Sequence, residues 1–357
     1  MEQYSVYRDI QARTGGEIYL GVVGPVRTGK STFIKRFMEQ MVLPGITDEH
    51  QKNRTRDELP QSAAGKTIMT TEPKFVPKEA ARIDLGEDTA VKVRLVDCVG
   101  FMTEGASGHM ENEKERLVKT PWFEESIPFT MAAEIGTRKV IRDHSTIGLV
   151  ITTDGSFGEL ERQAYIKPEE TAVRELQEIG KPFLVLLNSS RPYSEETRNL
   201  ARELETKYGV CVMPVNCEQL KTGDIYQILK QVLFEFPVTE VDFQIPKWLE
   251  ILPASHWLKQ QAVKAARNAM SHIRRMKDLK DSWKDEEAEA VSSMETGRMN
   301  LSDGKVMVRM LFEDGYYYQI LSDFSGLSIA DEYQLMQQLK DLAAKKSEYD
   351  KIQNAVE

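Results

Sequence analysis

The sequence predicts an α/β domain, with a mostly parallel sheet covered by helices on both faces, followed by a smaller α+β domain. Short, β-rich apolar segments alternate with amphipathic helical segments from residue 17 to about residue 235. The segment FPVTEVDFQIPK at 236–247 carries two prolines, has no helical period and ends that alternation. We therefore expect two domains, at 1–238 and 239–357.

The first domain begins with a strand that leads through a glycine-rich loop into a helix. Glu17 to Val23 (EIYLGVV) is the expected strand, and the segment STFIKRFMEQMVL that begins at Ser31 is the expected helix. Further buried strands are expected at 91–96, 146–152, 183–187 and 210–215. Further helices are expected near 168–180, 194–208 and 222–235. The connections at 44–72 and 101–145 are too long for ordinary loops, which indicates a function or inserted structure there.

The second domain has a different pattern. A long charged helix is expected at 254–290. The segments KVMVRMLF (305–312) and YYYQIL (316–321) alternate like strands, and Asp314-Gly315 between them favours a tight turn, so a β-hairpin is expected. A last polar helix is expected at 329–352.

Composition limits the kinds of partner and compartment. A net charge of −9 and a pI near 5.4 disfavour nucleic acid as a partner. The spacing of Cys98, Cys211 and Cys217 matches neither a zinc motif nor a disulfide framework, so we expect reduced thiols and a cytoplasmic protein. The N-terminus lacks an apolar signal core and no apolar run approaches about 20 residues, so membrane association is expected to be peripheral.

The glycine-rich loop carries the strongest chemical signal. Gly24 to Ser31 (GPVRTGKS) fit the pattern G-x-x-x-x-G-K-[ST] between a predicted strand and a predicted helix, which predicts a P-loop nucleoside triphosphatase. In such a loop the backbone amides surround phosphate oxygens, Lys30 holds the β- and γ-phosphates as a catalytic residue, and the Ser31 hydroxyl binds Mg²⁺. The structural alternative is a glycine-bearing turn that matches by chance. The loop residues expected to contact the nucleotide are Gly24, Pro25, Val26, Arg27, Thr28, Gly29, Lys30, Ser31 and Thr32.

Two further segments are expected to complete the phosphate and metal site. In VRLVDCVG, Asp97 follows an apolar strand and is expected to orient a Mg²⁺-bound water, while the N–H of Gly100 approaches the γ-phosphate. In TIMTTEP, Thr70 and Thr71 stand where a switch threonine would reach Mg²⁺ and the γ-phosphate, and either could serve. An aspartate that simply ends a strand, and two β-branched residues that begin one, are the structural alternatives.

The base-recognition signal favours ATP over GTP. GTP-binding P-loop proteins usually carry N-K-x-D after the fifth strand, and the Asp of that motif accepts hydrogen bonds from guanine. Here Asn188 is followed by Ser189-Ser190-Arg191, so that carboxylate is missing. Asn188 remains a nucleotide-contact candidate. Phe101 stands where a glutamine often positions the attacking water, so hydrolysis is expected to be slow.

The segments GPVRTGKS, TIMTTEP, VRLVDCVG and LVLLNSSRP together resemble the stage IV sporulation protein A family, the ATP-hydrolysing spore-coat morphogenetic scaffold of endospore-forming bacteria. The resemblance implies a translation-factor-like P-loop domain that uses ATP and Mg²⁺, then a middle domain. It also implies a C-terminal domain that this chain, ending at Glu357, is expected to lack. The positions that match the family's nucleotide site are Lys30, Ser31, Thr70, Thr71 and Asp97.

The resemblance also implies a biological role. Members of the family self-assemble into a polymer that forms the basement layer of the coat, in the mother-cell cytoplasm at the surface of the outer forespore membrane. Implied partners are other copies of the chain, spore-coat proteins and a small amphipathic membrane peptide. Two alternatives remain open: a regulatory GTPase-like switch for a protein partner, and a structural protein that keeps ATP without hydrolysing it.

Overall fold

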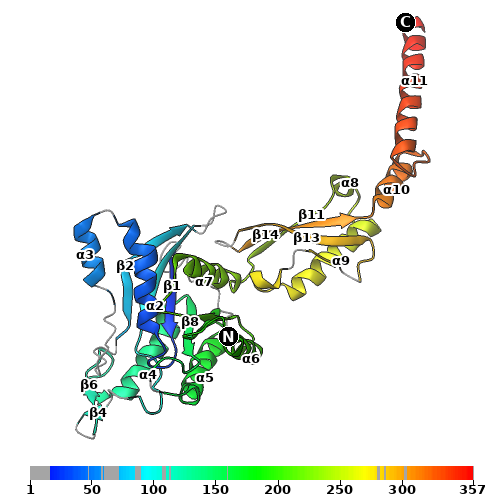
Figure 1. The fold of residues 1–357 in the computed structure, drawn as a ribbon. Helices are drawn as coiled ribbons and strands as arrows, with labels where there is room; N and C mark the ends of the chain where they lie inside the picture. The colour runs from blue at the N-terminus through cyan, green and yellow to red at the C-terminus, as the bar shows by residue number, and fades with distance from the viewer. Residues whose placement is uncertain are drawn as a thin grey trace. The chain divides into compact units, whose positions relative to one another are not determined.

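The computed structural model of the chain describes two compact units, which we treat separately (Figure 1). Unit 1 ends at Pro237 and unit 2 begins at Val238. The described residues are 17–46, 48–57, 59, 72–84, 90–106, 110–111, 114–158, 160–279, 282–284, 287–300 and 304–356.

Unit 1 contains a six-stranded sheet with the order β10-β9-β8-β1-β3-β2. All neighbouring strands run parallel except β2 and β3, which are antiparallel. The predicted mostly parallel sheet is therefore confirmed, with one antiparallel edge strand that the sequence did not predict. The strands are β1 Glu17–Val23, β2 Lys74–Asp84, β3 Ala90–Asp97, β8 Ile147–Thr153, β9 Phe183–Asn188 and β10 Val212–Val215.

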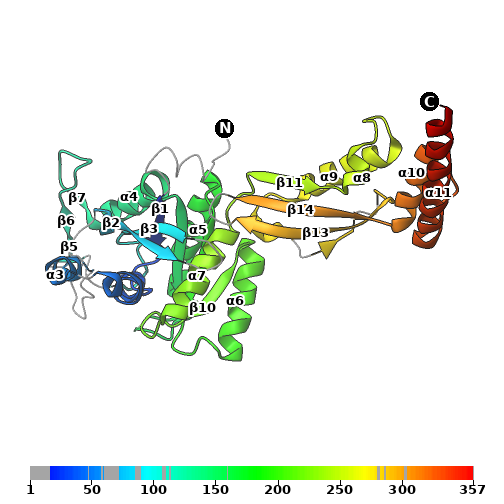
Figure 2. The ribbon, with the colours of Figure 1, turned by 90° about the horizontal axis from the view of Figure 1, so that it is seen from above.

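Helices pack on both faces of this sheet (Figures 1 and 2). Side chains alternate across β1, so that Tyr19 and Val23 join one hydrophobic core with residues of α5, α6 and the π-helix η3 (Val140–His144). The helices α2 and α7 contact β1, β3 and β9. The predicted helices of unit 1 are thus confirmed, at α2 Lys30–Phe37, α5 Arg162–Ile179, α6 Glu195–Tyr208 and α7 Thr222–Phe234.

The two long connections hold inserted structure, as predicted. The first contains the π-helix η1 Met38–Val42, the 3₁₀ turn η2 Leu43–Gly45 and α3 Glu49–Asp57. The second contains α4 Phe129–Lys139 and η3 Val140–His144, preceded by four two-residue strands, β4 Met110–Glu111, β5 Lys114–Glu115, β6 Leu117–Val118 and β7 Ile127–Pro128.

Unit 2 is an α+β unit built on a four-stranded sheet of order β11-β14-β13-β12. The helix α9 covers one face, where its buried alanines pack against Val291, Met294 and Val308. The elements are β11 Glu240–Gln244, α8 Lys247–Glu250, α9 Trp257–His272, η4 Met276–Asp278, β12 Ser282–Trp283, β13 Val291–Asn300, β14 Lys305–Phe312, α10 Asp314–Ser325 and α11 Glu332–Val356.

Two predictions for this second domain are wrong. The long helix expected at 254–290 ends at His272, because the buried stripe of α9 stops at Ala269 and the chain continues into short extended pieces and β13. The hairpin expected between 305–312 and 316–321 does not form, because 305–312 pairs with β13 instead. The tyrosines that follow lie in α10, where Asp314 occupies the first turn of a helix rather than a hairpin turn.

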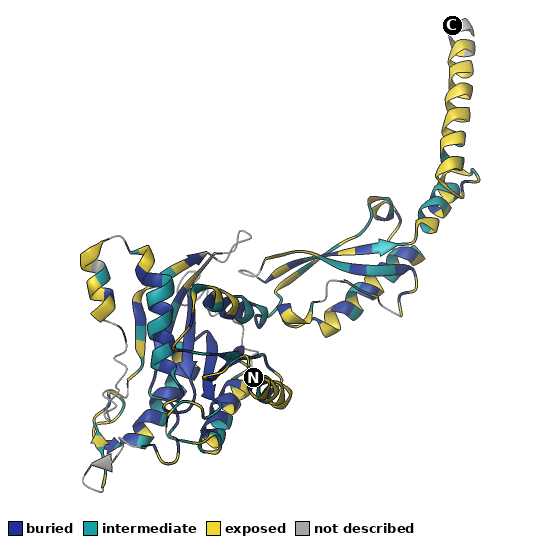
Figure 3. Ribbon diagram, in the orientation of Figure 1, coloured by how far each residue is buried: buried dark blue, intermediate teal, exposed yellow. Residues whose placement is uncertain are grey.

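The last helix, α11, matches the predicted polar helix, and most of its described residues are exposed (Figure 3). No helix among the described residues combines the length and the apolar character needed to cross a membrane.

Candidate functional site

The glycine-rich loop joins the end of β1 to the start of α2 through unusual backbone conformations. The φ angle is 125° at Gly24, 65° at Arg27 and 98° at Gly29, which is the N-cap of α2. A Cβ atom on Gly24 would lie 2.4 Å from the carbonyl oxygen of Ile151, so only glycine fits there. The loop therefore passes close to the end of β8, and it leads directly into the N-terminus of α2.

Lys30 is the first residue of α2 and lies beneath the loop. Its ammonium group donates to the carbonyl of Pro25 at 2.5 Å and to that of Gly24 at 3.4 Å, and only 5% of the residue is exposed. Burial lowers the pKa of the Lys30 ammonium, while the neighbouring Cys98 and Asp97 act in the opposite direction. The lysine is thus a buried cation held at the centre of the loop.

The segment that follows β3 is hydrogen-bonded to the loop through backbone atoms. The Phe101 N–H donates to the Gly24 carbonyl at 3.1 Å, and the Val26 N–H donates to the Phe101 carbonyl at 2.9 Å. Gly100 has a φ of 102°, and a Cβ atom there would lie 2.6 Å from the Lys30 ammonium nitrogen. Gly100 is therefore in direct contact with the loop and its lysine.

Asp97 ends β3 directly opposite Val22 of β1, which brings its carboxylate to the first turn of α2. The Ser31 hydroxyl hydrogen-bonds to the Asp97 carboxylate, and burial raises the pKa of that carboxyl to about 6 although Lys30 pulls it down. The other carboxylate oxygen, Oδ1, is buried and has no hydrogen-bond partner among the described residues. An unpartnered carboxylate oxygen beside a serine hydroxyl fits the oxygen ligands that Mg²⁺ prefers.

The remaining predicted residues are placed as follows. Thr28 is buried and its hydroxyl donates to the Pro25 carbonyl at 3.0 Å, which tightens the loop. Arg27 is exposed at the tip of the loop, and Thr32 is partly buried in the first turn of α2. Thr70 and Thr71 lie outside the described residues. Within the described part of the chain, no three His, Cys, Asp or Glu side chains gather as a metal cluster.

Asn188, at the end of β9, is hydrogen-bonded to the backbone of the glycine-rich loop. Its side-chain amide donates to the Thr28 carbonyl at 3.0 Å, and its Oδ1 accepts from the Cys217 N–H at 3.0 Å. A Cβ atom on Gly29 would lie 2.6 Å from the Asn188 Nδ2, so the contact is close. Both polar atoms of this side chain are therefore engaged in holding the backbone of the site.

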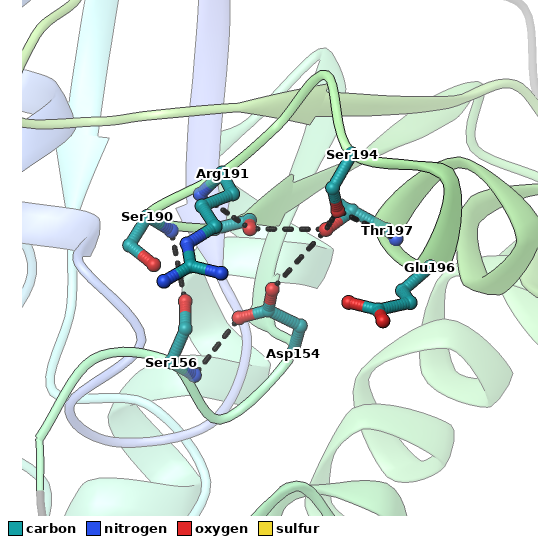
Figure 4. Close-up of a pocket in the computed structure, with 8 residues that line it drawn as sticks. Asp154, Ser156, Ser190, Arg191, Ser194, Glu196 and Thr197 are labelled. Carbon is teal, nitrogen blue, oxygen red and sulfur yellow. Dashed lines mark hydrogen bonds between the residues drawn. The ribbon is translucent and has the colours of Figure 1, made fainter.

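A separate cavity of about 240 Å³ lies where β8 and β9 end (Figure 4). Asp154 enters it from the segment after β8, accepting from the Ser156 N–H at 2.9 Å and from the Thr197 hydroxyl at 3.4 Å. Sequence reasoning missed Asp154, although it follows a buried strand in the same way as Asp97. The lining residues are Asp154, Ser156, Ser189, Ser190, Arg191, Ser194, Glu196 and Thr197.

Thr137 is a second residue that sequence reasoning missed. It lies in α4, is fully buried, and accepts a hydrogen bond from the Gly100 N–H at 3.1 Å. A single threonine inside a helix carries no pattern that sets it apart, so only the folded chain reveals the contact.

Comparison with known proteins identifies the family. Residues 1–237 match the family model described as stage IV sporulation protein A, ATPase domain, and residues 238–357 match the middle-domain model of the same protein. The chain belongs to the stage IV sporulation protein A family. The resemblance expected from four short segments is thereby confirmed, and every site residue described above falls within the ATPase-domain match.

Three relatives extend the match over the whole chain. Stage IV sporulation protein A of Clostridioides difficile (strain 630) is 45% identical over 353 residues, which covers 99% of this chain and 72% of the relative. The proteins of the same name from Bacillus anthracis and Bacillus subtilis (strain 168) are each 45% identical over 357 residues, which covers 100% of this chain and 73% of each relative. A role in sporulation is implied by that shared name.

Proposed function

We propose that this member of the stage IV sporulation protein A family is a P-loop ATPase whose nucleotide lies along the loop at 24–31. The carrying observation is that the buried ammonium of Lys30, the carboxylate of Asp97 and the backbone of Gly100 meet at one end of that loop. This arrangement supports the proposal, because a cation and backbone amides at the start of a helix are the groups that bind phosphate.

Magnesium completes the proposed site. Ser31 and Asp97 would hold it, with Thr70 and Thr71 as further candidates from the first long connection. Mg²⁺ would supply positive charge that offsets the negative charge of the phosphate groups. Lys30 would leave the carbonyls of Gly24 and Pro25 to bind phosphate oxygens, and its buried position keeps water away from that contact.

Adenine rather than guanine is the proposed base. Arg191 stands at the fourth position of the segment that begins with Asn188, and its side chain cannot accept hydrogen bonds from the donor edge of guanine. Asn188 itself is committed to Thr28 and Cys217, so its proposed contribution to nucleotide binding is to hold the loop in place.

The biological role proposed here follows from family membership. The chain would act as a spore-coat scaffold that self-assembles with ATP, in the mother-cell cytoplasm at the outer forespore membrane surface. Other copies of the chain, spore-coat proteins and a small amphipathic membrane peptide are the proposed partners. The exposed helix α11, with exposed Tyr333, Met336 and Leu339, supports a surface available for protein contacts.

The enzyme half is tested by phosphate release with ATP and with GTP, each with Mg²⁺ and with EDTA. We expect turnover with ATP and Mg²⁺ that Lys30→Ala abolishes. Lys35→Ala, which changes a partly exposed lysine of the same helix, should leave turnover intact. Equal release by the unmodified chain and Lys30→Ala, or preferential use of GTP, would contradict the proposal. The scaffold half is tested by sedimentation, where a monomer at every protein concentration with ATP would contradict it.

A further inference from the structure

The Gly100 amide is held by a helix that the nucleotide motifs do not include. Its N–H donates to the Thr137 hydroxyl at 3.1 Å, and that hydroxyl in turn donates to the Ala133 carbonyl at 2.8 Å. Since the hydroxyl proton is used within α4, the oxygen is free to serve as the acceptor for Gly100. Thr137 and Gly100 are both buried, so this bond is shielded from water.

Gly100 also lies next to the proposed position of the terminal phosphate. A Cβ atom on Gly100 would lie 2.6 Å from the Lys30 ammonium nitrogen and 2.3 Å from the Gly24 carbonyl oxygen. A phosphate held by Lys30 would therefore lie beside Gly100, and in the proposed site one of its oxygens accepts from the Gly100 N–H. Because the amide has a single proton, the Thr137 hydroxyl and the phosphate compete for it.

The helix that carries Thr137 is fixed to its surroundings at both ends. Arg138 and the nearby Arg142 each bond to Glu175 of α5 at 2.9 Å. At the start of α4 the Phe129 N–H donates to the Arg116 carbonyl at 2.9 Å, and the Thr130 N–H donates to Glu115 at 2.9 Å. Thr137 is thus a fixed acceptor, connected through α4 to the inserted strands at 114–128.

We infer that Thr137 is a positioning residue that holds the Gly100 amide until a terminal phosphate displaces it. This inference rests on the proposed function. A nucleotide with a γ-phosphate must break the Gly100–Thr137 bond, whereas a diphosphate leaves it in place. Thr137 therefore lowers the affinity for ATP relative to ADP, and it couples the terminal phosphate to α4 and the insert.

The test measures the affinities of a non-hydrolysable ATP analogue and of ADP, both with Mg²⁺, and compares their ratio between variants. Thr137→Val removes the acceptor with little change of shape. We expect it to raise the preference for the ATP analogue about fivefold, the size of one neutral hydrogen bond. Thr137→Ser keeps the hydroxyl and should restore the original ratio. Thr146→Val is the matched control, since this buried threonine exchanges hydrogen bonds with the backbone of Tyr19 in β1.

A ratio that stays unchanged in Thr137→Val, or that changes equally in Thr146→Val, would overturn the inference. A purely structural role would lower both affinities together and leave their ratio unaltered. If Thr137→Val does not fold, Thr137→Ala tests the same prediction, because alanine also lacks the hydroxyl and favours a helix. Absence of binding of either nucleotide to the unmodified chain would instead contradict the proposed function.

Discussion

The side-chain amide of Asn188 donates to the carbonyl of Thr28 at 3.0 Å, although the two residues lie 160 positions apart. The end of β9 thereby holds the glycine-rich loop in shape. We expect Asn188→Ala to lower the free energy of unfolding by about 2 to 4 kcal/mol, because the Thr28 carbonyl and the Cys217 N–H both lose their partner. Nucleotide affinity should fall with it.

Denaturant unfolding and calorimetric titration with ATP check this prediction. The control is Asn199→Ala on the exposed surface of α6, which should change neither quantity measurably. Unchanged stability in Asn188→Ala would show that the loop keeps its shape without the side chain.

Asp97 predicts a characteristic pH dependence in the presence of EDTA. Its pKa is about 6 in the folded chain, against an ordinary value of 3.8, so the folded chain binds this proton more tightly than the unfolded chain. This carboxyl therefore stabilises the fold at low pH, and its contribution is lost as the pH rises from about 4 to about 6. Relative to Asp97→Asn, the unmodified chain should lose at most about 3 kcal/mol across that window.

Urea unfolding at several pH values between 4 and 7 gives the difference between the two chains. Asp97→Asn retains every other titrating group, so the difference between the two chains isolates the contribution of Asp97. Parallel curves for both chains would contradict the shifted pKa. Mg²⁺ should strengthen ATP binding to the unmodified chain above about pH 6, where the carboxylate is ionised.

Gly100 cannot carry a side chain without moving the loop. We expect Gly100→Ala to abolish ATP turnover and to cost about 1 to 3 kcal/mol from the backbone conformation alone, since φ is 102° there. The matched control is Gly223→Ala in α7, where a Cβ atom meets nothing within 4 Å. That change should stabilise the chain by up to about 1 kcal/mol. Thermal unfolding and phosphate release distinguish the two, and a fully active Gly100→Ala variant would refute the close contact.

Glu169 and Glu170 are adjacent in sequence, yet their substitution is expected to lower the stability of the chain by very different amounts. Glu169 is fully buried and binds Arg162, the Thr152 hydroxyl and the Tyr208 hydroxyl. Glu169→Gln should therefore cost about 3 to 5 kcal/mol, because Arg162 loses its charged partner in the interior. Glu170 pairs with Lys207 at the surface, and Glu170→Gln should cost less than about 1 kcal/mol. Equal losses in denaturant unfolding would contradict this assignment.

Much of unit 1 could be predicted because its elements carry strong local patterns. Continuous apolar runs mark β1, β8 and β9, which are buried on both faces, and the helices between them show clear amphipathic periods. The edge strand β2 was not predicted, because many of its residues are partly or fully exposed and it therefore lacks a continuous apolar run. It pairs antiparallel with β3.

Unit 2 was harder to predict because the same short signal serves two structures. Asp314-Gly315 is typical of a hairpin turn, yet an acidic residue also suits the first turn of a helix, and α10 begins there. The strand β13 was hidden because its sequence, VSSMETGRMN, is mostly polar and its register shifts twice. Pairing with β14 stabilises it, and that partner lies beyond the reach of local patterns.

The candidate site divides along the same line. Lys30, Ser31 and Asp97 belong to motifs whose spacing along the chain predicts them, and the structure brings them together. Thr137 of α4 meets Gly100, and Asp154 lines the separate cavity after β8, only because the folded chain brings distant segments together. Asn188 was expected to contact the nucleotide, which stays a prediction, and in the structure its side chain bonds to the loop backbone.

Phe101 has a consequence for engineering. Its backbone is bonded to Gly24 and Val26, while its side chain is 3% exposed and packs in the core with Cys98 and Val150. Glutamine at this position would bury its side-chain amide in an apolar environment without hydrogen-bond partners. The single substitution Phe101→Gln therefore cannot supply a catalytic glutamine, because the backbone directs this side chain into the core. The group that orders the attacking water in the proposed reaction has to come from a different segment or from a neighbouring molecule.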